Sequence, residues 1–143
     1  MTDRKIYGNF IAIEPIAADI EQLLKEPYDY IILDYAFGYL NDCVGKHIDL
    51  AVFIDTPLDV ALARFIIRDY TSRSKERGFG LSDVDEMSLE ALDKELRWYL
   101  THSRPTYTKM SEMHKPVSDL IVDGMKTLEE IADIIIKSIR SAV

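Results

Sequence analysis

Five of the chain's 17 basic residues lie between residues 64 and 77: Arg64, Arg68, Arg73, Lys75 and Arg77. Arg64 and Arg68 are four residues apart, so both side chains lie on one face of the helix that we expect there. Guanidinium groups bind phosphate oxygens through paired N–H donors and can neutralise the charge that develops during phosphoryl transfer. The cluster therefore predicts a polyphosphate-binding site.

A second interpretation explains the same basic residues. Asp69 and Glu76 lie within the cluster and could pair with the cations on a solvated helix face. The residues alone leave both interpretations open.

Carboxylates follow three predicted strands. Asp34, Asp55 and Asp123 each close a short apolar run, and parallel sheets bind ligands beyond the carboxyl ends of their strands. Asp34 has the form of the carboxylate that holds Mg²⁺ beside a nucleotide, usually through water. Without further context, a strand-end Asp that caps the next turn is the simpler explanation, and the Asp123-Gly124 pair also indicates a turn.

The histidines and the cysteine indicate no catalytic or metal-binding array. His47, His102 and His114 are scattered, without a Cys or His at ligand spacing, so we expect surface histidines or histidines with satisfied hydrogen bonds. Cys43 is the single cysteine and cannot form an internal disulfide, which fits a reducing compartment.

Strands and helices alternate along the sequence. Compact apolar runs predict strands at 30–33, 50–54 and 120–122, and residues 5–14 give a weaker strand signal. Amphipathic patterns predict helices at 17–25, after Thr56-Pro57, at 88–100, between Pro105 and Pro116, and from Thr127 onward. This order predicts an α/β fold with a parallel sheet and helical crossovers.

Size and charge restrict the possible functions. At 143 residues and 48% hydrophobic content, the chain fits one α/β domain over residues 1–143. Its net charge of −8 disfavours nucleic acid and anionic membrane surfaces as partners. The sequence contains neither a membrane-spanning apolar run nor a signal-peptide core, so we expect a cytoplasmic protein.

Three segments together resemble the uridine-kinase-like P-loop kinases. Residues 29–37, ending around Asp34, resemble the Walker B region of that family, and residues 48–69, with the core Leu62-Ala63-Arg64 and Arg68-Asp69, resemble its strand-to-lid segment. Residues 118–124 resemble the family's final strand.

The resemblance implies a nucleoside kinase that transfers the γ-phosphate of ATP, with Mg²⁺, to a nucleoside or a similar small hydroxyl compound. Asp34 matches the Walker B acid, and Arg64 and Arg68 match catalytic lid arginines that contact the phosphates. Arg73 and Arg77 fall in the implied lid region, 64–80, as further cofactor-binding residues.

The sequence also departs from the family pattern. Phe65 stands where the family often has a second adjacent arginine, and no residues match Gly-x-x-x-x-Gly-Lys-[Ser/Thr], the phosphate-cradling loop. We therefore expect a partial P-loop-kinase fold that lacks the P-loop strand and helix and is inactive alone. The alternatives are a non-catalytic relative that binds a nucleotide or a partner and dimerises, or a structural domain without a ligand. In the kinases that this chain resembles, the strand leading to the P-loop lies between the strands that correspond to 30–33 and 50–54. We expect its place to be filled by residues 5–14, by direct pairing of the 30–33 and 50–54 strands, or by a second chain in a homodimer.

Overall fold

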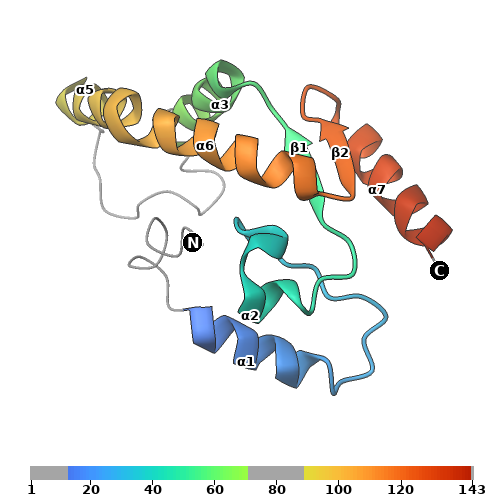
Figure 1. Cartoon of the computed structure of the whole chain (residues 1–143). Coiled ribbons are helices and arrows are strands. Elements are labelled where there is room, and N and C mark those ends of the chain that lie inside the picture. Colours follow the sequence, from blue (N-terminus) through green and yellow to red (C-terminus); the bar gives the residue numbers. More distant parts are fainter. Residues whose placement is uncertain (1–12, 71–88, 143) are drawn as a thin grey trace.

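A computed structural model of the chain describes residues 13–70 and 89–142. A small parallel sheet lies at its centre, with α3, α5 and α6 above and to one side, α7 on the other side, and α1 and α2 below (Figure 1). The predicted mixed α/β architecture with a partial parallel sheet is confirmed.

The sheet consists of β1 (Val52–Asp55) and β2 (Leu120–Asp123). The strands are parallel, with Phe53 opposite Ile121 and Asp55 opposite Asp123. Parallel neighbours require a long crossover, and here it consists of the chain between β1 and β2, which includes α3, α5 and α6. Val122 is 2% exposed and forms part of the small core.

The helices after the two strands begin where the sequence predicts. α3 (Leu58–Tyr70) starts directly after Pro57, whose carbonyl accepts a hydrogen bond from Ala61 N–H at 2.9 Å. α7 (Leu128–Ala142) has the predicted capping box. Thr127 N–H donates to Glu130 Oε2 at 2.9 Å, and Glu130 N–H donates to Thr127 Oγ1 at 3.2 Å.

The predicted pair of helices around Pro105 forms one continuous rod. α5 (Leu89–Trp98) runs through a π-helical turn, η2 (Tyr99–Ser103), into α6 (Arg104–His114). A proline ring crowds the carbonyl four residues earlier in a straight α-helix, and the wider π-turn directly before Pro105 relieves that crowding. A short 3₁₀ turn, η3 (Lys115–Val117), then leads toward β2.

The predicted strand at 30–33 is wrong. These residues are irregular, and Tyr30 and Ile32 are 62% and 93% exposed. Apolar composition alone does not form a strand, because the backbone N–H and C=O groups also need a partner strand. In the described chain, β1 pairs only with β2, so direct pairing of residues 30–33 with β1 does not occur.

The other predicted elements of the first half are partly confirmed. The helix predicted at 17–25 is α1 (Ile13–Leu23). The weak strand at 5–14 is wrong for residues 13 and 14, which belong to α1, and residues 5–12 lie outside the described residues.

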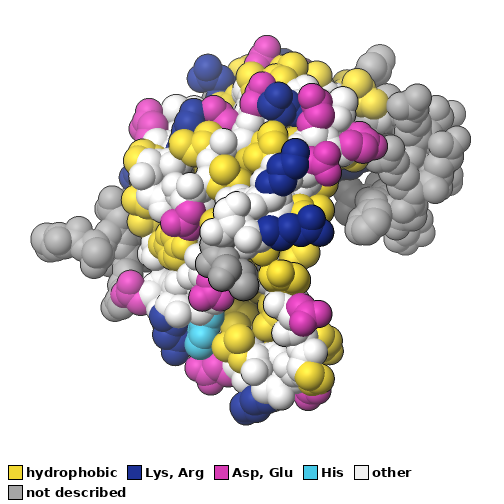
Figure 2. Space-filling view, turned by 90° about the vertical axis from the view of Figure 1, so that its right-hand side faces the viewer, with side chains coloured by type: hydrophobic (Ala, Val, Ile, Leu, Met, Phe, Trp, Pro, Cys, Tyr) yellow, Lys and Arg dark blue, Asp and Glu magenta, His cyan; other side chains and the backbone are white. Residues whose placement is uncertain are grey.

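A lower lobe is built from α1, η1 (Gly38–Leu40) and α2 (Asp42–Gly45). Asn41 caps α2, because its Oδ1 accepts hydrogen bonds from the N–H groups of Cys43 and Val44 at 3.0 and 3.2 Å. Val44 and Ile20 are 0% and 3% exposed and form the lobe's core. Hydrophobic side chains also reach the surface on the face shown in Figure 2, so the described part of the molecule buries its apolar residues incompletely.

Asp119 joins the lower lobe to the amino end of the sheet. Its Oδ2 accepts hydrogen bonds from Tyr39 Oη at 2.5 Å and from Ala51 N–H at 2.7 Å. Its own N–H donates to Ala51 O at 3.0 Å. The bond from Tyr39, followed by that from Ala51, lowers the pKa of the Asp119 carboxyl below its usual range.

We expect Asp119→Asn to lower the free energy of unfolding at pH 7 by about 1 kcal/mol, a small value because the carboxylate is exposed. A carboxyl with a lowered folded pKa stabilises the fold above its unfolded pKa of about 3.9, and this contribution is lost as the pH falls through the folded pKa. Urea unfolding at a series of pH values should therefore show the difference between wild type and variant shrinking under acid conditions. A difference that persists unchanged at the lowest pH would contradict this role, and Asp29→Asn, at an exposed carboxylate, is a control for the loss of one charge.

Candidate functional site

The carboxyl ends of β1 and β2 form a compact group of polar residues. Asp55 and Asp123 are register partners, and Gly124 N–H donates to Asp55 O at 2.9 Å. A Cβ on Gly124 would lie 1.9 Å from Thr56 Oγ1, so the two strand ends approach too closely for any other residue at position 124. Asp123 Oδ1 accepts a hydrogen bond from Met125 N–H at 2.8 Å, which confirms the predicted turn.

Lys115 adds a cation that the sequence interpretation missed. Its Nζ forms a hydrogen-bonded ion pair with Asp55 Oδ2, and the two side chains are 39% and 42% exposed. Lys115 is 60 residues from Asp55 in sequence, so no local spacing links the two.

Arg64 reaches the same strand ends from α3. Its Nη1 donates to the carbonyl oxygen of Gly124 at 3.0 Å. A guanidinium carries five N–H donors, and this contact uses one of them. The structure thus places one of the two predicted helix arginines beside the carboxyl ends of the strands, where ligands of parallel sheets bind.

Arg68 contacts its neighbour in sequence instead. Nε and Nη2 donate to Asp69 Oδ1 and Oδ2 at 2.7 and 2.9 Å. These bonds raise the pKa of Arg68 and lower the pKa of Asp69. This pair is the one expected for a solvated helix face, so in the structure Arg68 and Arg64 share a helix but not a common partner.

The remaining predicted phosphate ligands cannot be placed. Arg73 and Arg77 lie outside the described residues, as do Lys75, Glu76 and most of the predicted lid region at 64–80. Their roles stay predictions.

Asp34 lies in the irregular segment between α1 and η1. It is exposed, and within the described residues no hydrogen bond or ion pair joins it to Arg64 or Arg68. The prediction that it closes a strand is wrong, because residues 30–33 form no strand. Its carboxylate nevertheless remains accessible to solvent.

The aromatic residues after Asp34 form core contacts. Phe37 is 9% exposed, and its ring meets that of Tyr35 edge to face with centroids 5.3 Å apart. Burial raises the pKa of Tyr35. The aromatic cluster therefore packs the lower lobe in the described structure.

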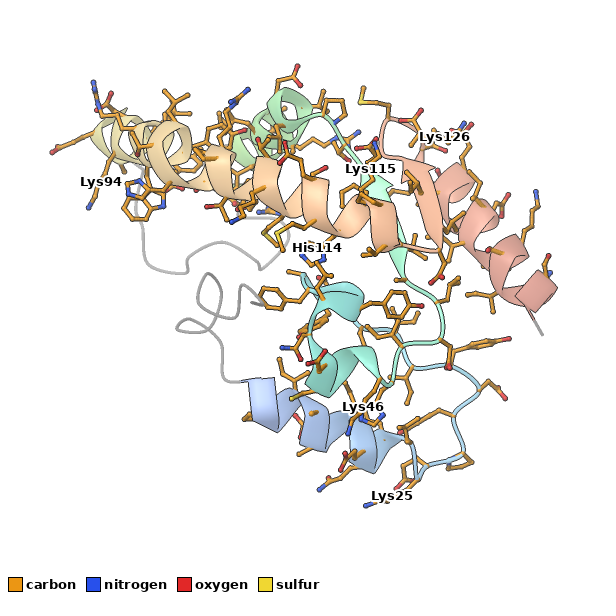
Figure 3. All side chains as sticks on the ribbon, in the orientation of Figure 1. Lys25, Lys46, Lys94, His114, Lys115 and Lys126 are labelled. Atoms are coloured by element: carbon orange, nitrogen blue, oxygen red, sulfur yellow. The ribbon has the colours of Figure 1, made fainter. Side chains whose placement is uncertain are left out.

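His114 departs from the expectation of surface or satisfied histidines. It is 6% exposed, and its Nε2 is buried without a hydrogen-bond partner among the described residues. Burial lowers its pKa, and a hydrogen bond with the Phe37 backbone partly opposes this shift. Figure 3 shows the imidazole projecting from α6 toward the lower lobe.

Two classes of feature are not found in the described part of the chain. Residues 13–70 and 89–142 contain no group of three or more His, Cys, Asp or Glu side chains that could hold a metal ion. No helix in these ranges has the length and apolar character needed to span a bilayer.

Comparisons with known proteins show which proteins the sequence is similar to. Residues 9–127 match the sequence model of the phosphoribulokinase / uridine kinase family. The uridine kinase of Brevibacillus brevis is 28% identical over 102 residues, which cover 71% of this chain and 41% of the relative. The uridine kinase of Staphylococcus haemolyticus is 25% identical over 123 residues, which cover 86% of this chain and 52% of the relative.

A third relative, the uridine kinase of Macrococcus caseolyticus, is 27% identical over 118 residues, 82% of this chain and 50% of the relative. The chain thus spans about half the length of the curated relatives that it matches. No solved structure gives a significant match. Because the family match extends over most of the chain, the protein belongs to the phosphoribulokinase / uridine kinase family.

Proposed function

We propose that the chain is part of a nucleoside kinase and that Arg64 helps to bind the phosphates of ATP during transfer to a nucleoside. The observation that carries this proposal is the position of Arg64, whose guanidinium contacts Gly124 O at the carboxyl ends of the two strands. Phosphoryl transfer is catalysed mainly by positioning and by stabilisation of charge, and a guanidinium at this edge supplies both.

We propose that Arg68 takes part by releasing the Asp69 carboxylate and binding phosphate oxygens in its place. Its paired N–H donors already hold the two oxygens of the Asp69 carboxylate, the geometry in which a guanidinium also binds two phosphate oxygens. Both Arg68 and Asp69 are at least partly exposed, so their ion pair costs little to break. Arg73 and Arg77 would extend the same phosphate-binding region.

ATP and Mg²⁺ are the proposed cofactors. Mg²⁺ is typically bound by one or two carboxylates together with substrate phosphates and waters, so a single accessible carboxylate fits it. Asp34 is exposed and would be that ligand. When bound, Mg²⁺ would neutralise phosphate charge, while Arg64 and Arg68 hold the phosphate oxygens.

We further propose that the 143-residue chain does not perform the reaction alone. None of its residues matches the loop whose backbone N–H groups and lysine cradle the β- and γ-phosphates. Lid arginines stabilise phosphates that this loop already holds in place, so without the loop they contribute little to phosphoryl transfer.

A second candidate function is nucleotide or partner binding without catalysis. Two observations favour it: Arg68 is paired with Asp69, and Asp34 forms no hydrogen bond or ion pair with either arginine in the described part of the chain. If the arginine variants lose nucleotide binding but the wild-type extended protein shows no turnover, the function is binding and not phosphoryl transfer.

The double variant Arg64→Ala, Arg68→Ala should weaken ATP binding about tenfold or more, because two charge-assisted contacts are removed. Calorimetric titration should use this chain and a version extended upstream by a P-loop segment. Arg97→Ala is the control, since Arg97 is an exposed helical arginine that also pairs with a carboxylate, that of Asp93. Equal affinity of wild type and double variant in the extended protein would reject the phosphate role.

Asp34→Asn should reduce Mg²⁺-dependent turnover of the extended protein on the order of a hundredfold, because the amide keeps the shape but loses the charge. The thermal unfolding midpoint should stay unchanged, since Asp34 is exposed. Asp29→Asn, an exposed neighbour, controls for loss of one charge. An unaltered dependence of rate on Mg²⁺ concentration would exclude Asp34 as the ligand.

The purified 143-residue chain should show no ADP release above background with ATP, Mg²⁺ and a panel of nucleosides. The physical reason is the loss of several preorganised phosphate contacts, each typically worth on the order of a hundredfold or more in rate. A coupled ADP-release assay on the chain and on the extended protein measures this directly. Turnover by the short chain that disappears in the Arg64→Ala variant would overturn the proposal of inactivity.

A further inference from the structure

A short joint connects β1 to α3, and the chain on both sides of it is contacted from the rod formed by α5, η2 and α6. The joint is Thr56-Pro57, between Asp55 at the end of β1 and Leu58 at the start of α3. Because the joint is so short, a change of direction at either flank passes directly to the helix. The direction of α3 therefore depends on what fixes Asp55 and Leu58.

Tyr99 fixes the flank of the joint that belongs to α3. It lies in the π-turn of the rod, is 9% exposed, and its Oη donates to Leu58 O at 3.2 Å. A carbonyl oxygen has two lone pairs, so Leu58 O can accept this bond in addition to one from inside the helix. The ring is buried and so holds the hydroxyl in one place, and π-turns are frequent at functional sites.

Lys115 fixes the flank that belongs to β1. It directly follows the rod as the first residue of η3, and its Nζ is hydrogen-bonded to Asp55 Oδ2 in the ion pair described above. A partly exposed ion pair contributes little to stability by itself. Its effect here is geometric, because Lys115 and Tyr99 attach one continuous element to both flanks of the joint.

We propose that Tyr99 and Lys115 are positioning residues that hold the start of α3, and through it the guanidinium of Arg64, at the carboxyl ends of the strands. Arg64 lies about 9 Å beyond Leu58 along the helix axis, so a tilt of roughly 10° at the joint moves its backbone by about 1.5 Å. N–H···O bonds form over a range of only about 0.5 Å, and Arg64 Nη1 donates to Gly124 O at 3.0 Å. The holding of α3 stands on these contacts alone, and its consequence for ATP rests on the proposed function of Arg64.

Hydrogen exchange of the whole 143-residue chain tests the holding of α3. Tyr99→Phe removes only the hydroxyl and should lower the protection of the Ala61 amide, in the first turn of α3, about fivefold because one hydrogen bond is lost. Tyr107→Phe is the matched control, since Tyr107 is an exposed tyrosine of the same rod. The control should leave the protection of Ala61 unchanged.

Lys115→Met should lower the same protection about twofold, since a partly exposed ion pair is weaker than a buried hydrogen bond. Lys115→Arg keeps the charge and should restore the protection. Lys94→Met is the control, at an exposed lysine of α5 near the opposite end of the rod from Lys115 (Figure 3). Unchanged protection of Ala61 in Tyr99→Phe or in Lys115→Met would overturn the proposal, as would a loss spread equally over the amides of α7, which would show general destabilisation.

A double-mutant cycle on the ATP affinity of the extended protein tests the consequence for Arg64. Tyr99→Phe should weaken ATP binding about threefold when Arg64 is present and not at all after Arg64→Ala, because the hydroxyl acts through that guanidinium. An equal loss in both backgrounds would show a general effect on structure and overturn the positioning role. If Arg64→Ala itself leaves ATP affinity unchanged, the proposed function fails, and hydrogen exchange still decides whether the rod holds α3.

Discussion

The parallel pairing of β1 with β2 is the constraint on which the described structure depends. It sets Asp55 beside Asp123 and brings Gly124 against Thr56 so closely that no side chain fits there. Because both strands run in the same direction, α3 and α7 depart from the same end. Arg64 on α3 can therefore reach the turn after β2, and the group of polar residues at the carboxyl ends of the strands follows from the pairing.

Local signals were sufficient to predict the elements that have local causes. β1, β2 and the starts of α3 and α7 were predicted because a short apolar run, a proline and a capping box act within a few residues. The strand at 30–33 was predicted on the same grounds and is wrong. Its composition favours a strand, but strand formation also requires a partner edge, which depends on the whole fold and cannot be read within the segment.

In the candidate site, too, only the features with local causes could be predicted from the sequence. Helical spacing placed Arg64 and Arg68 on one face, and the adjacency of Asp69 indicated the ion pair that Arg68 forms. The carbonyl that Arg64 contacts and the pairing of Lys115 with Asp55 each join residues 60 apart, so they depend on how α3 and α6 pack around the strands. Buried His114 was missed for the same reason: burial depends on the position of the lower lobe against α6.

Because of the π-turn at Tyr99–Ser103, the side chains of α5 and of α6 point in different directions along one continuous helix. A π-turn holds one residue more than an α-helical turn, and each residue in an α-helix advances the side-chain direction by about 100°. Trp98 and His102 stack directly above one another there, with ring centroids 3.8 Å apart, while Tyr99 donates to Leu58 O at the start of α3. Insertion of a single residue at this turn would therefore rotate the side-chain directions of α5 relative to those of α6, while the helix axis stays continuous.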